Sequence, residues 1–202
     1  MAAVSDAVAD ASGQRMLTEG IARAYEAGTA TLRDTAGVRL LAQGSDGGEL
    51  APAPQVVETA TLGGHVTDEV FGASGVVVRY ADTDALVIHL EQLEGQLTAT
   101  VHYAPADADA ARRLIPVLED TAGRILFNGW PTGVEVSHAM VHGGPFPATS
   151  DPRSTSVGTL AIERFQRPVC YQNVPADLLP AAVRDDNPWG LTHRVDGELH
   201  LP

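Results

Sequence analysis

The sequence predicts an α/β fold, a three-layer and mostly parallel sheet with crossover helices. Two observations support this class. Segments with strand character alternate with segments of helical periodicity from about residue 38 to residue 127. The strand segments, of which Val76-Val77-Val78 is the clearest, are continuous β-branched or apolar runs rather than alternating ones. Strands that are apolar on both faces are typical of parallel sheets covered by helices.

The individual elements follow from local signals. A weak, alanine-rich helix is expected within residues 2–12, and a better one begins after Thr18, a favourable N-cap, and ends by Gly37. Further helices open at Asp82 or Thr83 and at Asp107, and Gly95 and Gly123 end them. Strands are expected at 38–41, 54–59, 76–78, 97–103 and 125–127.

A long connection follows the last of these strands. From Asn128 the chain is rich in Gly, Pro, Ser, Thr and His for nearly thirty residues. Connections of this length in compact domains are usually functional or disordered. Because this one carries Trp130, Met140 and Phe146, it has side chains to pack with, and we expect an ordered loop that lines a site. A helix-like segment, 156–165, and a strand-like one, 168–171, come after it.

The composition limits the function. The chain has 202 residues, 44% of them hydrophobic and 19% charged, with a net charge of −13 and no lysine among its 13 basic residues. The absence of lysine excludes Schiff-base chemistry by this chain, and the acidic balance argues against nucleic acid or an anionic membrane as partner. A single cysteine, no apolar run of 18 residues and no secretory signal favour the cytoplasm.

Histidines and the cysteine are the first candidate site residues. His138 and His142 have the four-residue spacing of a helical zinc site, but Gly143-Gly144 would end a helix at once, so we predict no metal site. His142 suits the rim of a cleft, where it could carry a proton, although an ordinary structural role is open. Cys170 falls within the strand-like segment, and we do not assign it as a nucleophile.

Glu69 and Phe71 form a second candidate. A carboxylate can accept hydrogen bonds from both hydroxyls of a ribose, and an aromatic ring two residues later can support a planar ring. Taken alone, the two residues are better explained as a helix-end acid and a core phenylalanine. The chain contains neither a G-x-S-x-G elbow nor a glycine-rich phosphate fingerprint after a strand.

Several motifs together resemble the aldehyde dehydrogenase superfamily. The segment Thr67–Gly72 (TDEVFG) is similar to E-[EI]-[IV]-F-G-P, although Ala73 stands in place of the final proline. Segments 96–101 and 123–128 are similar to two later strands of that family. From Asn128 to Gly158 the chain matches, almost residue for residue, the NADP-preferring α-ketoglutaric semialdehyde (2,5-dioxovalerate) dehydrogenases. The resemblance covers roughly residues 16–195.

The resemblance implies a specific chemistry. In this family a thiolate attacks the aldehyde, hydride leaves for the nicotinamide, and activated water releases the carboxylate. Glu69 would bind the nicotinamide ribose of NADP or NAD, Phe71 would support the nicotinamide, and His142 would lie near the aldehyde pocket. The family's thiol, base glutamate and Rossmann half have no match here. We therefore expect the C-terminal part of a longer enzyme, inactive alone.

The resemblance also implies a domain division and an assembly. Residues 1–166 would be part of the catalytic domain, and 167–202 would be an oligomerisation strand and tail. The strand Arg167–Gln172 would join subunits of a homo-oligomer. One alternative is a non-catalytic short relative that associates with full-length subunits. Another is a zinc hydrolase built on His138 and His142.

Overall fold

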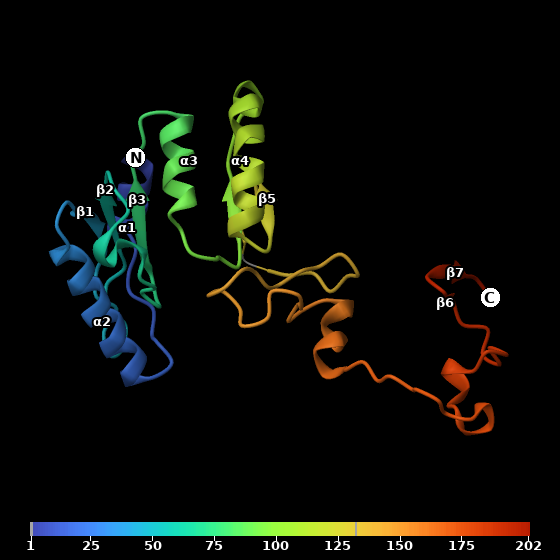
Figure 1. Cartoon of the computed structure of the whole chain (residues 1–202). Coiled ribbons are helices and arrows are strands. Elements are labelled where there is room, and N and C mark those ends of the chain that lie inside the picture. Colours follow the sequence, from blue (N-terminus) through green and yellow to red (C-terminus); the bar gives the residue numbers. More distant parts are fainter. Residues whose placement is uncertain (1, 132) are drawn as a thin grey trace. The chain divides into compact units, whose positions relative to one another are not determined.

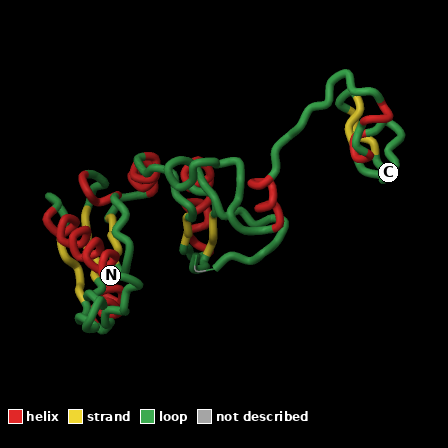
Figure 2. The backbone as a smooth tube through the Cα atoms, turned by 90° about the horizontal axis from the view of Figure 1, so that it is seen from below, coloured by secondary structure: helices red, strands yellow, loops and turns green. Residues whose placement is uncertain are grey.

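A computed structural model describes residues 2–131 and 133–202. The chain divides into two compact units, residues up to Ala161 and Ile162–Pro202. Each unit is considered by itself. The first contains the helices and strands that were expected from the sequence, and the second is mostly irregular (Figure 2).

The first unit begins with a three-stranded sheet (Figure 1). Its strands are β1 (Arg39–Gln43), β2 (Gln55–Thr59) and β3 (Ser74–Val78). β2 lies in the middle, antiparallel to β1 and parallel to β3, and all five of its residues are buried. Helix α1 (Ala2–Ala9) contacts β1 but buries none of its own residues, in agreement with its weakly apolar sequence.

Helix α2 (Glu19–Asp34) covers this sheet. The Thr18 side chain accepts a hydrogen bond from the Ile21 N–H at 3.2 Å, so the predicted N-cap is confirmed. Leu32 of α2 packs with Val57 of β2 and with Val66 of the short 3₁₀ helix η1 (Gly64–Thr67). This small core fixes the segment that leads from η1 into β3.

A buried carboxylate ties the three strands together. Glu58 lies in the middle of β2 and is only 7% exposed. Arg39 of β1 and Arg79, just after β3, both pair with it. A buried charge is tolerated only when it is paired in this way, and the two ion pairs link β2 to the strands on both sides of it.

The second part of the first unit is a parallel pair, β4 (Ala99–Val101) and β5 (Ile125–Phe127). Helices α3 (Thr83–Glu91) and α4 (Ala108–Thr121) lie side by side next to it (Figure 1), and the 3₁₀ helix η2 (Pro105–Asp107) leads into α4. Asp82 caps α3 by accepting from the Ala85 N–H at 2.9 Å. α4 continues through Pro116 and buries Ala111, Leu114 and Leu118.

The second unit has little regular structure and no buried residue. It contains the 3₁₀ helices η4 (Ala176–Leu178) and η5 (Ala181–Val183) and one hairpin, β6 (His193–Val195) with β7 (Glu198–His200). A further 3₁₀ helix, η3 (Thr159–Phe165), spans the division between the units. The boundary expected at 166/167 remains a prediction about the domains.

Three expectations need correction. The α/β class and the parallel pairs are confirmed, but the described strands form three separate small sheets rather than one three-layer sheet. The segment 156–165 forms a 3₁₀ helix only from Thr159. No strand forms at Arg167–Gln172, because a strand needs a hydrogen-bonding neighbour and none pairs with this segment among the described residues. Within those residues no helix has the length and apolarity needed to cross a bilayer.

Candidate functional site

The segment Glu69–Gly72 is held against helix α2. Val70 packs on Gly28, where an added Cβ would lie 3.2 Å from Val70 Cγ2. A Cβ added at Gly72 would lie only 2.4 Å from Cδ2 of the Tyr25 ring. The φ of Gly72, +152°, also favours glycine. Glu69 and Phe71, by contrast, are exposed, Phe71 by 72%. The two contacts with α2 therefore leave the two predicted cofactor-binding side chains free on the surface.

Tyr25 also fixes where this segment enters the sheet. Its hydroxyl lies 2.9 Å from the Ala53 carbonyl and 3.0 Å from the Ala73 carbonyl and donates to them. These residues lie just before β2 and β3. Burial raises the pKa of the Tyr25 phenol, and the positive charge of Arg33 offsets part of that effect.

A hollow of about 870 Å³ opens beside Glu69. It is lined by Thr67, Asp68 and Glu69, by the segment 94–98, and by Pro147 and Ala148 of the long loop. Asp68 is paired with His65, with 2.6 Å between Oδ2 and Nδ1. No hydrogen bond or ion pair from the described residues occupies the Glu69 carboxylate. Glu69 is therefore available to accept hydrogen bonds from a ligand in this hollow.

Close backbone contacts between glycines anchor the long loop at the hollow. A Cβ at Gly144 would lie 2.4 Å from the Gln96 carbonyl oxygen, and one at Gly123 would lie 2.0 Å from the Gly143 carbonyl oxygen. The Gly95 N–H donates to the Phe146 carbonyl at 3.3 Å. Only residues without a side chain allow such an approach. The expectation of an ordered loop is confirmed for this part.

His142 is fixed through its backbone. Its N–H donates to Thr155 Oγ1 at 2.8 Å, and its carbonyl accepts from the N–H and hydroxyl of Ser156 at 3.0 and 2.9 Å. Thr155 is 6% exposed and donates in turn to the Val157 carbonyl at 2.6 Å. The Nδ1 atom of the His142 imidazole is buried and has no hydrogen-bond partner among the described residues. The ring therefore retains an unused polar atom.

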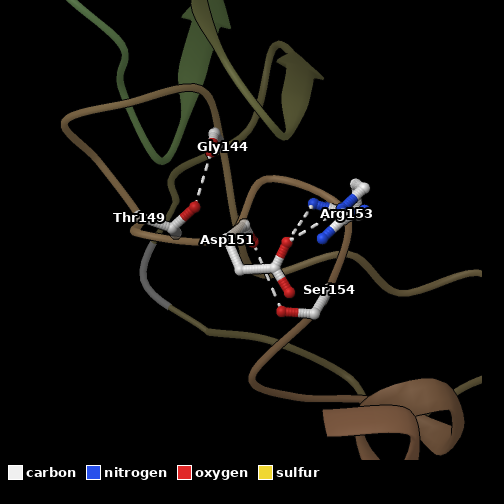
Figure 3. Close-up of polar contacts among 5 residues, drawn as sticks. All are labelled: Gly144, Thr149, Asp151, Arg153 and Ser154. Carbon is white, nitrogen blue, oxygen red and sulfur yellow. Dashed lines mark hydrogen bonds and ion pairs between the residues drawn. The ribbon is translucent and has the colours of Figure 1, made fainter. Parts of the chain in front are cut away.

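The turn before Thr155 holds the other side of the loop (Figure 3). Thr149 donates to the Gly144 carbonyl at 2.7 Å, and Asp151 accepts from the backbone N–H and Nε of Arg153 at 3.2 and 3.3 Å. These hydrogen bonds and the guanidinium charge lower the pKa of the Asp151 carboxyl, the backbone N–H making the largest contribution. Asp151 stays ionised and keeps the turn closed.

A small aromatic group lies where β4 and β5 end; the sequence predicts Asn128 and Trp130 at this strand end, but not His102 and Tyr103. The Asn128 N–H donates to the Val101 carbonyl, and its side chain accepts from the Tyr103 N–H, both at 2.9 Å. The rings of His102 and Trp130 are 5.3 Å apart. The sequence predicts a strand over 97–103, but β4 ends at Val101, so His102 and Tyr103 lie just past its carboxyl end, where ligand clefts in α/β sheets form.

The structure brings some of the predicted residues together and not others. Glu69 and the loop residues Pro147 and Ala148 line the same hollow, but His142 and Phe71 are not among its lining residues. Trp130 and Phe146 are 77% and 79% exposed, so the expected packing of these side chains within the loop is wrong.

His138, His142 and Cys170 all lie on irregular backbone, not in the helix and strand that their sequence patterns suggest. His138 and His142 lie on irregular backbone, so the helical spacing does not apply, and the described residues contain no group of three or more metal-ligating side chains. Cys170 is exposed on irregular backbone, which corrects its expected position in a strand.

Comparison with solved structures identifies the fold. The betaine aldehyde dehydrogenase of Staphylococcus aureus, solved with NAD⁺, superposes with a TM-score of 0.62 at 15% identity over 81% of this chain and 34% of that one. The Δ-pyrroline-5-carboxylate dehydrogenase of Mycobacterium tuberculosis, bound with NAD, gives 0.59 at 17% identity over 82% and 31%. The chain therefore has the fold of part of an aldehyde dehydrogenase.

The sequence is similar to a narrower group. It is 49% identical over 193 residues to alpha-ketoglutaric semialdehyde dehydrogenase 2 of Azospirillum brasilense, covering 91% of this chain and 36% of that protein. It is 45% identical over 203 residues to alpha-ketoglutaric semialdehyde dehydrogenase of Acinetobacter baylyi, covering 98% and 39%. No family model matches the chain. The resemblance to α-ketoglutaric semialdehyde dehydrogenases of the aldehyde dehydrogenase superfamily is confirmed, over less than two-fifths of the relatives' length.

Proposed function

We propose that this chain is the C-terminal part of an NAD(P)-dependent aldehyde dehydrogenase that oxidises α-ketoglutaric semialdehyde to the carboxylate. It supplies a wall of the nicotinamide and aldehyde site. The observation that carries the proposal is the free Glu69 carboxylate, at a hollow shared with the glycine-anchored loop. The identity of 45–49% to two enzymes named for this substrate supports the choice of aldehyde.

Each candidate residue has a role that its surroundings permit. Glu69 is exposed and unpaired among the described residues. Its two carboxylate oxygens can therefore accept hydrogen bonds from the two hydroxyls of the nicotinamide ribose of NAD or NADP. The exposed ring of Phe71 offers an apolar face to the nicotinamide. The nicotinamide, when bound, accepts the hydride from the aldehyde carbon. His142 is proposed as a proton carrier near the aldehyde pocket; because its Nδ1 is buried, the proton would be carried by Nε2.

We also propose that the chain does not turn over the aldehyde alone. Aldehyde oxidation in this family needs a thiolate and a base, and the family motifs that carry these two groups have no match in this sequence. Purified chain mixed with the semialdehyde and either nucleotide should give no reduced nucleotide at 340 nm. Turnover that Cys170→Ser abolishes would contradict this part of the proposal.

A chimeric enzyme tests the proposed roles directly. The matching part of the Azospirillum brasilense enzyme is replaced by this chain, and the chimera is expected to oxidise the semialdehyde. Glu69→Gln should raise KM for the nucleotide about 10- to 100-fold, the loss expected for hydrogen bonds to a charged group.

The neighbouring Asp68→Asn provides the matched control. Asp68 is already paired with His65, so this change should leave nucleotide KM within about twofold, as is usual for an exposed ion pair. A folded chimera with no activity, or equal effects of the two substitutions, would overturn the assignment of Glu69.

A second candidate function is association with full-length aldehyde dehydrogenase subunits. It is favoured by the exposed aromatic side chains of the first unit, Phe71, Trp130 and Phe146, which are 72–79% exposed. Exposed apolar groups mark a surface that further protein covers when they form one contiguous patch. Co-expression with a tagged full-length relative distinguishes this function: co-purification in a fixed ratio supports it, and separate elution excludes it.

A further inference from the structure

The hairpin β6–β7 places two histidines opposite each other. Asp196 and Gly197 connect the strands with φ values of +49° and +88°. Positive φ at both positions is typical of the two-residue hairpin turn that fixes strand register. The pairing makes His193 the direct cross-strand partner of His200. Because cross-strand partners project from the same face of a two-stranded sheet, the two imidazoles lie together.

The two rings are close enough to share one ligand. Their centroids are 5.6 Å apart, and the planes are inclined by only 20°. Two imidazole nitrogens that bind one metal ion in adjacent positions place their ring centroids about 5 Å apart, given a metal–nitrogen distance of about 2.1 Å. In the stacked arrangement the nitrogen lone pairs lie in nearly parallel planes, so both rings must turn about their side-chain bonds before one ion can bind to both.

One histidine is already oriented as metal-binding histidines are. His193 Nδ1 lies 2.9 Å from the Leu191 carbonyl oxygen, which can only accept, so Nδ1 carries the proton and Nε2 keeps its lone pair. Asn187 holds this carbonyl by donating to it from Nδ2 at 2.9 Å and by accepting from the Leu191 N–H at 2.8 Å. With Nδ1 protonated, the 3.3 Å approach of Asn187 Nδ2 to His193 Nδ1 is a contact between two donors and not a hydrogen bond. A ligating histidine typically donates its other N–H to a backbone carbonyl in this way.

We propose that His193 and His200 form a binding site for one divalent transition metal ion with affinity for imidazole, such as Cu²⁺, Ni²⁺ or Zn²⁺. Imidazole nitrogen is the preferred ligand type for these ions, and Cu²⁺ binds most tightly in the series. No group of three or more metal-ligating side chains occurs among the described residues, so water completes the coordination shell. The two histidines are not among the residues assigned above to the nicotinamide and aldehyde site.

The charges of the hairpin are compatible with a cation. Glu198 is two positions from His200 on the same strand, so its carboxylate is on the same face. Arg194 is on the opposite face, where its guanidinium donates to the Gly197 carbonyl at 3.0 Å. The net charge of the chain, −13, adds a general attraction for cations.

Copper binding to the full chain tests the proposal. Cu²⁺ is titrated at neutral pH and followed by electron paramagnetic resonance and calorimetry. One equivalent should bind with the hyperfine pattern of two nitrogen ligands. His200→Gln should weaken binding at least 10-fold and leave one nitrogen. His138→Gln, at an exposed histidine outside the hairpin, should change the affinity less than twofold. Equal effects of the two substitutions, or no effect of His200→Gln, would overturn the site.

A second measurement needs no substitution, so it holds even if a variant of the hairpin fails to fold. Substoichiometric Cu²⁺ added to the unaltered, ¹⁵N-labelled chain should broaden the resonances of residues 191–202 before all others. Broadening that begins instead around His138 and His142 would place the copper on that pair and refute the proposal.

Discussion

The ring of Tyr25 packs directly on the backbone of Gly72. A Cβ added at Gly72 would lie 2.4 Å from Tyr25 Cδ2, closer than real Cβ contacts. The contact joins helix α2 to the segment that carries Glu69 and Phe71, and the Tyr25 hydroxyl reaches the Ala73 carbonyl one residue further on. One buried aromatic side chain therefore determines where the proposed cofactor-binding segment lies.

Gly72→Ala should destabilise the chain. The new methyl group would collide with the buried Tyr25 ring at a φ of +152° that alanine rarely adopts. We expect the free energy of unfolding to fall by about 1–3 kcal/mol, the usual cost of overpacking, in urea denaturation followed by circular dichroism. Gly63→Ala is the matched control, because nothing lies within 4 Å of its Cβ position. A similar loss in both variants would show that the Tyr25 contact is not responsible.

The raised pKa of Tyr25 predicts a loss of stability at high pH. Burial raises the phenol pKa above its ordinary value of 10.0 in the folded chain. Below pH 10 the Tyr25 phenol is protonated in both the folded and the unfolded chain, so its contribution to the free energy of unfolding is fully present. As the pH rises through 10 towards the folded-state pKa, the unfolded chain releases its proton more readily, and unfolding becomes easier. Urea midpoints at pH 8 and at pH 11 should show this decrease.

Tyr25→Phe distinguishes the titration of Tyr25 from that of the other groups that lose a proton at high pH. The variant should be less stable at pH 8 by about 1–3 kcal/mol, because the Ala53 and Ala73 carbonyls lose their hydroxyl donor. Between pH 8 and pH 11 it should lose less stability than the unaltered chain. Parallel pH profiles for the two proteins would mean that Tyr25 is not the group that titrates.

Gly144→Ala should release the long loop from the start of β4. Its Cβ would lie 2.4 Å from the Gln96 carbonyl oxygen, which accepts from the Gly123 N–H at 3.2 Å. Hydrogen exchange at residues 142–157 should become at least 10-fold faster, a loss of about 1.4 kcal/mol of local stability. Gly129→Ala, whose Cβ would meet only ordinary contacts at 3.8 Å or more, should leave exchange in that range unchanged.

The segment Arg167–Gln172 should become a strand only on association. It has no strand partner among the described residues, and an extended segment with free N–H and C=O groups can pair with another chain. In the chimeric enzyme, Val169→Pro should therefore reduce the oligomer to smaller species in light scattering, because proline removes an N–H donor. Val169→Thr keeps that donor and the β propensity and should preserve assembly. An unchanged oligomer in both variants would locate the interface elsewhere.

Local sequence signals predicted much of the secondary structure. Thr18 and Asp82 cap their helices as expected, and the β-branched run at 76–78 lies in β3. These features depend on hydrogen bonds and conformational preferences within a few residues, which a sequence displays directly. The motifs from Thr67 to Gly72 and from Asn128 to Gly158 also led to the enzyme group, because function constrains residue order over a long stretch.

Other features depended on contacts between distant parts of the chain. The sequence did not indicate that Tyr25 would hold Ala53 and Ala73, 28 and 48 residues away, or that Gly144 would meet Gln96. It also predicted one sheet where three are found, since strand order follows from long-range pairing rather than from the strands themselves.

The sequence by itself thus determined the class of fold, the helix ends and the enzyme group to which the chain is similar. Only the tertiary structure decided that Glu69 is free at a hollow, that His142 keeps an unused buried nitrogen, and that His193 faces His200. The physical reason is that exposure, hydrogen-bond satisfaction and side-chain proximity are set by the packing of elements far apart in sequence.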